Sequence, residues 1–186
     1  NDNCGTCNKC ITICPTNAII EPYKLDARKC ISYLTIEHKD QIPIEYRKHI
    51  GNRIFGCDDC LAICPWNSFA IEANDNKLDE NSKINLIPLN TWLSLNDQKF
   101  REITSGTTIK RTGYIRMMRN CLIAAGNSKD TSLIEKIKSF LNSEYEMLRG
   151  ASVWALKQLL TSNEFQNLKK KHLKNEKSVE VKIEWR

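Results

Sequence analysis

The residues with the clearest chemical potential are cysteines, eight of which lie within the first 64 of 186 positions. The first run follows the pattern Cys-x-x-Cys-x-x-Cys-x-x-x-Cys-Pro and comprises Cys4, Cys7, Cys10, Cys14 and Pro15. Three closely spaced thiolates of this kind bind one iron–sulfur cluster, and the fourth reaches a neighbouring cluster. Pro15 lacks a backbone N–H and has a restricted φ, so it turns the chain directly after Cys14.

The second run has the same ending but one cysteine fewer. It comprises Cys57, Cys60, Cys64 and Pro65. Ile54 stands where a full repeat would place a cysteine, and Cys30, alone upstream, can supply the missing ligand. With the crossed ligation of bacterial two-cluster ferredoxins, the sequence predicts two [4Fe–4S] clusters. The first set of ligands is Cys4, Cys7, Cys10 and Cys64, and the second set is Cys14, Cys30, Cys57 and Cys60.

The apolar residues between the later cysteines are expected to shield the clusters from water, which influences reduction potential. They are Ile11, Ile13, Leu61 and Ile63. Cys121, the ninth cysteine, lies among apolar residues of a helical pattern, so we interpret it as a small buried residue.

Two other chemistries are open to a cysteine-rich chain. A disulfide framework is disfavoured because nine cysteines are an odd number and no secretory leader opens the sequence. Zinc sites usually combine two separated Cys-x-x-Cys pairs, a pattern that four cysteines in eleven residues fit poorly. Iron–sulfur chemistry is therefore the favoured interpretation.

The sequence pattern around and after these cysteines predicts an α+β fold that is mostly α. We expect a ferredoxin-like double-cluster domain over residues 1–72 with a helical insertion at about 24–52, a polar linker over 73–88, and a helical domain over 89–186. Asp26 is expected to cap a helix that passes Cys30 and ends near His38. Pro43 and Gly51 bracket a second helix.

Apolar residues at three- and four-residue steps predict further helices over about 109–127, 131–141 and 144–161. Residues 118–125 resemble residues 148–155 at an offset of thirty, which is typical of paired helices in a short HEAT-like solenoid. The strictly alternating tail, residues 179–185, predicts a short strand. No stretch is apolar enough to span a membrane.

The charge is unevenly distributed. Residues 1–90 carry 10 Lys and Arg against 12 Asp and Glu, a net of −2, so residues 91–186 carry 18 against 10, a net of +8. A basic helical surface suits nucleic acid, although lysines that only solvate a surface give the same net charge. The candidate cluster is Lys110, Arg111, Arg116 and Arg119.

Four segments of the sequence resemble the epoxyqueuosine reductase family. They are residues 4–19, residues 25–37 with the displaced Cys30, residues 50–60, and residues 64–67. The first is common to ferredoxin-like domains, whereas the second and third are specific. The resemblance continues more weakly through residues 109–111 and 119–120 and so covers most of the chain.

This resemblance implies a cobalamin-dependent reduction of an epoxide on the modified base at the tRNA wobble position, with two clusters supplying electrons to the cobalt. It also implies that a preceding domain, which this chain lacks, binds the corrinoid and supplies the proton donor, so no catalytic residue is assigned here. Ser32, Cys57 and Asp58 are candidates for the rim of the cobalamin site. A serine on a helix surface and an ordinary turn are the plainer interpretations of these positions.

The basic cluster would then contact the anticodon region of tRNA, and an external donor would reduce the iron–sulfur clusters. We expect a cytoplasmic monomer without membrane contact. One alternative is a ferredoxin-type carrier whose helical domain docks a protein partner, and another is part of a cobalamin enzyme similar to reductive dehalogenases. The segment around Cys30 and the basic helices favour the tRNA enzyme.

Overall fold

The computed structural model of the chain describes residues 3–71, 84 and 86–186, so most of the predicted linker lies outside the described residues. The cysteine-bearing part consists of short helices around one antiparallel hairpin. Its elements are α1 (Lys9–Ile13), β1 (Ile19–Glu21), β2 (Lys24–Leu25), η1 (Ala27–Lys29), α2 (Ile31–Ile36), α3 (Ile44–Ile50), α4 (Asp59–Ala62) and η2 (Pro65–Phe69). The hairpin pairs Ile19 with Leu25 and Glu21 with Lys24.

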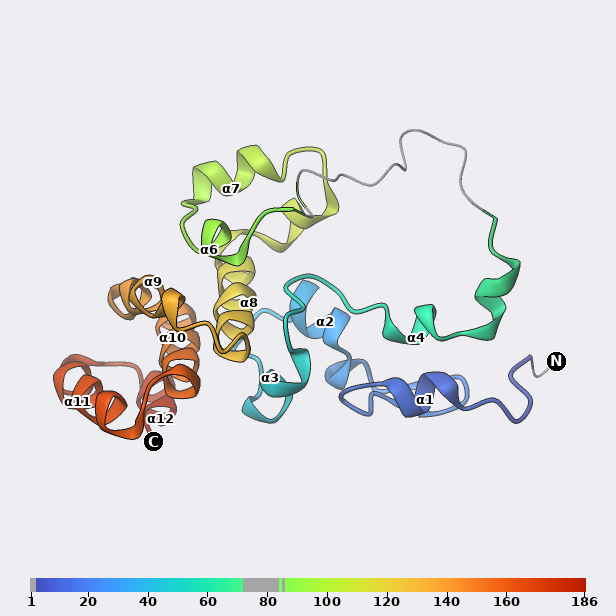
Figure 1. Ribbon diagram of the computed structural model, residues 1–186, viewed down its shortest axis with the longest axis horizontal. Helices are drawn as coiled ribbons and strands as arrows, with labels where there is room; N and C mark the ends of the chain where they lie inside the picture. The colour runs from blue at the N-terminus through green and yellow to red at the C-terminus, as the bar shows by residue number, and fades with distance from the viewer. Residues whose placement is uncertain (1–2, 72–83, 85) are drawn as a thin grey trace.

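The remaining described part is helical. Its elements are α6 (Leu89–Trp92), α7 (Asp97–Ile103), η4 (Thr108–Thr112), α8 (Tyr114–Asn127), η5 (Thr131–Leu133), α9 (Ile134–Ser139), η6 (Phe140–Asn142), α10 (Glu146–Leu159), α11 (Ser162–His172), η7 (Leu173–Asn175) and α12 (Val179–Glu184). The cysteine-bearing helices α1 and α4 lie at one end of the molecule and α9 to α12 at the other, with α2, α3 and α8 between them (Figure 1). The expected fold class, mostly α with a small sheet, is confirmed.

One apolar core joins the insertion to the helical part. Ile31 and Leu34 of α2 and Ile50 of α3 are buried in the same cluster as Met118 and Leu122 of α8. Complete burial of a side chain of this size contributes roughly 1.5–3 kcal/mol. The insertion is thus attached to α8 as well as to the cysteine segments.

Helices α8 and α10 approach very closely at Gly126. A Cβ at this position would lie 2.6 Å from Cζ3 of Trp154 and 2.9 Å from Cα of Ala155. Residues 118–125 and 148–155, which resemble each other in sequence, therefore face each other as a helix pair. The pairing agrees with the repeat that the sequence predicts, without establishing a HEAT-like array.

Several helix boundaries follow the sequence. Pro43 precedes α3 and Gly51 ends it, as predicted. Asp26, however, caps the short η1 through the N–H of Arg28, and α2 begins separately after Cys30. The helix expected over 109–127 is interrupted at Gly113, whose φ of 77° favours glycine and separates η4 from α8.

The predicted C-terminal strand is wrong, because residues 179–184 form helix α12. The Ser178 hydroxyl accepts a hydrogen bond from the N–H of Val181 and caps this helix. Val181 and Trp185, four residues apart, are both buried, whereas Val179 and Ile183 are exposed. The buried residues therefore follow the helical spacing, and the alternation of residue types does not match the burial.

Across the described parts of the chain, the helices are all too short or too polar to cross a lipid bilayer.

Candidate iron–sulfur site and adjoining cleft

The second predicted ligand set lines one cavity. This cavity has a volume of about 360 Å³. The cysteines that line it are Cys10, Cys14, Cys30, Cys57 and Cys60. They come from the two ends of α1, the start of α2 and the start of α4, and α1 packs against α4. The structure thus brings the isolated Cys30 to the cysteines with which the sequence groups it.

The surroundings of these thiols affect their protonation. Burial opposes ionisation of Cys14, but hydrogen bonds from the backbone N–H groups of Ala18, Thr16 and Ile19 outweigh it and lower the pKa of Cys14. The distance from the Ala18 nitrogen to the Cys14 sulfur is 3.2 Å. Burial raises the pKa of Cys57 and of Cys60, and the neighbouring Cys30 and Cys14 add to the effect at Cys60. Of these three thiols, Cys14 is therefore the one that ionises most readily to the thiolate, the form that ligates iron.

The arrangement fits a multi-iron cluster. In a [4Fe–4S] cluster each thiolate binds a different iron, so the four sulfurs surround the group at its corners. The thiols border a cavity with apolar walls that include Ile19, Leu25 and Ile31.

The first ligand set is supported by hydrogen bonds near its ends. The Tyr23 hydroxyl accepts from the N–H of Asn3 at 2.8 Å and from the N–H of Cys4 at 3.2 Å. The indole N–H of Trp66, two residues after Cys64, donates to the Asn3 carbonyl at 3.2 Å. These contacts hold the two ends of the crossed set together, as a cluster shared by Cys4 and Cys64 requires.

Three of the four residues expected to form an apolar shield are exposed, and the fourth, Ile11, is half-buried. Ile13, Leu61 and Ile63 are 45%, 61% and 41% exposed. The helices α1 and α4 contain only five and four residues. Cysteines four residues apart, such as Cys10 and Cys14 or Cys60 and Cys64, lie on the same side of a helical turn, so most of the side chains between them point away from the thiols.

The three candidates for a cobalamin rim differ in their surroundings. The Ser32 hydroxyl accepts from the N–H of Cys57 at 2.9 Å and donates to the carbonyl of Cys57 at 3.1 Å. Asp58 is exposed, and its carboxylate does not cap α4. Sequence reasoning missed the pairing of Ser32 with Cys57, since a sequence separation of 25 gives no local signal.

The basic candidates separate into exposed and enclosed side chains. Lys110 and Arg111 are exposed, and Arg111 forms an ion pair with Glu37 at 2.5 Å. Arg116 is half-buried, and its guanidinium donates to four backbone carbonyls. Arg119 is fully buried, so the prediction that it lies on the basic surface is wrong.

Arg119 is enclosed because its guanidinium hydrogen-bonds carbonyl oxygens of the insertion. It donates to the carbonyls of Leu34 at 2.7 Å and His38 at 2.9 Å, and also to that of Asp40. Burial, with the nearby Arg116 and Arg47, lowers the pKa of Arg119 to about 9. The group remains cationic at neutral pH.

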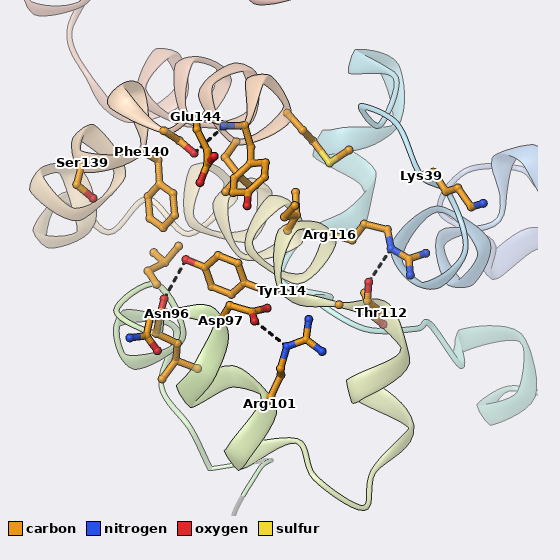
Figure 2. A pocket seen from close by; sticks show the side chains of 18 residues that line it. Lys39, Asn96, Asp97, Arg101, Thr112, Tyr114, Arg116, Ser139, Phe140 and Glu144 are labelled. Atoms are coloured by element: carbon orange, nitrogen blue, oxygen red, sulfur yellow. Dashed lines mark hydrogen bonds and ion pairs between the residues drawn. The ribbon is translucent and has the colours of Figure 1, made fainter.

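A second cavity, of about 1000 Å³, lies between α7, the start of α8 and the start of α10. In Figure 2, Tyr114 lies between Asn96 and Asp97 on one side and Phe140 and Glu144 on the other. The Tyr114 hydroxyl donates to the Leu95 carbonyl at 3.0 Å, which fixes its ring. Arg101 pairs with Asp97 at 2.7 Å. This cleft offers aromatic and polar groups beside the exposed basic residues of η4.

Comparison with known proteins agrees with the cysteine geometry. Residues 3–67 match a protein family described as a 4Fe-4S double cluster binding domain. The chain is 42% identical over 157 residues to an epoxyqueuosine reductase of Xanthomonas campestris pv. campestris, which covers 84% of this chain and 44% of that protein. It is 40% identical over 158 residues to an epoxyqueuosine reductase of Escherichia coli K12, which covers 84% of this chain and 41% of that protein.

Solved structures give the same result for the fold. A crystal structure of epoxyqueuosine reductase with a tRNA-Tyr epoxyqueuosine-modified stem loop superposes with a TM-score of 0.90 at 31% identity, over 100% of this chain and 49% of that one. The Bacillus subtilis epoxyqueuosine reductase superposes with a TM-score of 0.91 at 31% identity, over 100% and 50%. The chain spans about half the length of these relatives. Over that half, the matches confirm the resemblance to epoxyqueuosine reductases that the cysteine segments predict.

Proposed function

We propose that this chain is the electron-transferring and tRNA-docking part of an epoxyqueuosine reductase. The observation that carries the proposal is one cavity lined by Cys14, Cys30, Cys57 and Cys60, the four cysteines of the predicted second set, together with Cys10. The similarity to epoxyqueuosine reductases, one of them solved with a tRNA stem loop, supports the substrate. The paired helices that follow are proposed to form a short HEAT-like dock.

The proposed reaction consumes two electrons and two protons. The epoxide oxygen leaves as water, and a carbon–carbon double bond remains. When bound, the clusters would pass electrons one at a time towards cobalamin, and the cysteines of this chain would hold the clusters in place. Of the three rim candidates, only Asp58 is exposed. Ser32 and Cys57 are partly buried, and the Ser32 hydroxyl is hydrogen-bonded to the backbone of Cys57. The proton donor is expected in the preceding domain.

A direct test uses the natural full-length protein with both clusters and cobalamin, a low-potential reductant, and an RNA stem loop that carries epoxyqueuosine. We expect the modified base to lose one oxygen atom, as measured by mass spectrometry of the RNA. Omission of either the reductant or cobalamin should abolish the change. If the clusters accept electrons while the RNA stays unchanged, the ferredoxin-type carrier is the better description.

The tRNA dock predicts binding that depends on salt. The exposed cations Lys110 and Arg111 should each neutralise a phosphate and release counterions, Arg111 by exchanging its surface ion pair with Glu37 for the phosphate. Replacing both with glutamine should weaken binding of the stem loop and reduce the slope of log affinity against log salt by about 1 for each phosphate that is no longer neutralised. Fluorescence anisotropy over a range of salt concentrations measures both quantities.

The matched control is Lys170→Gln with Lys171→Gln, two exposed lysines of α11, which removes the same charge. This change should leave the salt slope unaltered, because we interpret those lysines as solvating an exposed surface. Equal loss of binding in both pairs of variants would indicate nonspecific attraction by net charge and would contradict a defined dock.

A further inference from the structure

Polar side chains of α8 bind the carboxyl end of α2. Arg116 donates to the carbonyl of Ile36 at 2.9 Å, and Asn120 donates to that of Thr35 at 2.8 Å. Arg119 donates to the carbonyl of Leu34 in α2, and its other carbonyl partners, His38 and Asp40, lie just beyond this end of the helix. The last carbonyls of a helix lack partners within the helix, and its carboxyl end attracts positive charge. Two cations and one amide of α8 therefore fix α2 at this end.

The same α2 helix holds the segment that carries Cys57. Ser32 binds both polar groups of the Cys57 peptide, as described above. The Thr35 hydroxyl accepts from the N–H of Gly56 at 3.0 Å and donates to the carbonyl of Ile31 at 2.7 Å. Asn120 uses its second amide hydrogen on the carbonyl of Ile54 at 2.9 Å. Three side chains thus fix residues 54–57, two from α2 and one from α8.

The contacts of α8 with α2, and those of α2 with residues 54–57, both involve ligands of the predicted second set. Cys30 immediately precedes α2, and Cys57 lies in the segment that α2 holds. Thr35 and Asn120 are fully buried, so water does not compete for these hydrogen bonds. The positions of two ligands from separate parts of the chain consequently depend on one short helix.

We propose that α2 is a positioning element through which helix α8 sets the geometry of the second cluster, with Ser32, Thr35 and Asn120 as its positioning residues. The proposal deepens the proposed function, on which it rests for the presence of a cluster in this cavity. Groups that orient metal ligands typically change metal affinity 10–100-fold when they are removed. The cluster held by Cys14, Cys30, Cys57 and Cys60 should accordingly respond to changes in α2, and the other cluster should not.

Thr35→Val tests this proposal because it removes the hydroxyl while keeping the shape of the side chain. Thr104→Val is the matched control, since Thr104 is equally buried and also donates to the carbonyl four residues earlier, here that of Phe100. Both are made in the natural full-length protein after reconstitution with iron and sulfide. Iron release to a chelator and the electron paramagnetic resonance spectrum of the reduced clusters are measured.

In Thr35→Val we expect about half of the iron to be released roughly tenfold faster, with a changed signal and midpoint potential for one cluster. The remaining iron should be released as in the wild type, and Thr104→Val should alter neither cluster. Ser32→Ala should reproduce the effect of Thr35→Val, and Ser32→Thr, which retains a hydroxyl, should restore the wild-type signal. Ser32→Ala also provides the test if Thr35→Val does not fold.

Unchanged release and spectra in both Thr35→Val and Ser32→Ala would overturn the proposal, as would equal changes in both clusters. A wild-type protein that binds no second cluster would instead contradict the proposed function, so the two failures are distinguishable.

Discussion

Replacing Cys30 with serine is expected to remove one of two [4Fe–4S] clusters and to leave the other in place. Cys30 lines the same cavity as Cys14, Cys57 and Cys60, and we predict that it supplies the ligand missing from the second cysteine run. Without its thiolate one iron of that cluster loses its protein ligand. Iron and acid-labile sulfide should fall from about eight to about four of each per chain after anaerobic reconstitution.

The control for this experiment is Cys121→Ala. Cys121 is completely buried in α8, and burial raises its pKa strongly, so it stays a thiol in the apolar core. Its replacement should leave the iron and sulfide content at the wild-type level. Full iron content in Cys30→Ser would show that this cysteine is no ligand, and bound zinc in the wild type would contradict both clusters.

The second large effect concerns stability. Replacing Glu184 with glutamine should lower the free energy of unfolding by about 3 kcal/mol or more, because it leaves the charge of Arg47 buried without its counterion. The two side chains are 8% and 2% exposed and form two hydrogen bonds, at 2.6 and 2.9 Å. Arg47 also donates to the carbonyl of Ile42 at 2.7 Å and lies 5.7 Å from the ring centre of Trp154. Denaturant unfolding monitored by circular dichroism measures the loss.

Glu102→Gln is the matched control, because Glu102 pairs with Lys99 on the surface of α7, where both side chains are largely exposed. Exposed pairs of this kind contribute little to stability, so the unfolding curve should not move. The double replacement Arg47→Met with Glu184→Leu should recover much of the stability lost in Glu184→Gln, since it removes both buried charges. Equal effects of Glu184→Gln and Glu102→Gln would refute a special role for the buried pair.

The sequence predicts the grouping of the cysteines from ligand number and spacing, and the structure brings the four cysteines of the second set, with Cys10, to one cavity. An incomplete run with Ile54 in place of a cysteine requires one more thiol, and Cys30 was available. The helix from Ile44 to Ile50 was similarly predictable, because its ends are marked by Pro43 and Gly51. Residue counts, spacings and helix-bounding residues can be found in the sequence itself and do not depend on what packs against the segment.

The environments of Arg119 and of the C-terminal segment could not be predicted in the same way. Charge alone favours a surface position for an arginine, but the carboxyl end of α2 supplies enough carbonyls to accommodate Arg119 in the core. The alternation in residues 179–185 predicted a strand, whereas burial of Val181, Glu184 and Trp185 selects a helix. Both outcomes depend on partners that are distant in the sequence.

The core shared by α2, α3 and α8 has a consequence for protein engineering. A ferredoxin-like segment transplanted from a relative would bring its own α2 and α3, whose apolar residues must fit the α8 that remains. A mismatch at Ile31, Leu34 or Ile50 would leave voids or overlaps in a closely packed interior. Functional chimeras should therefore exchange α8 together with the cysteine segments, so that the unit of exchange is defined by packing rather than by the cysteine motif.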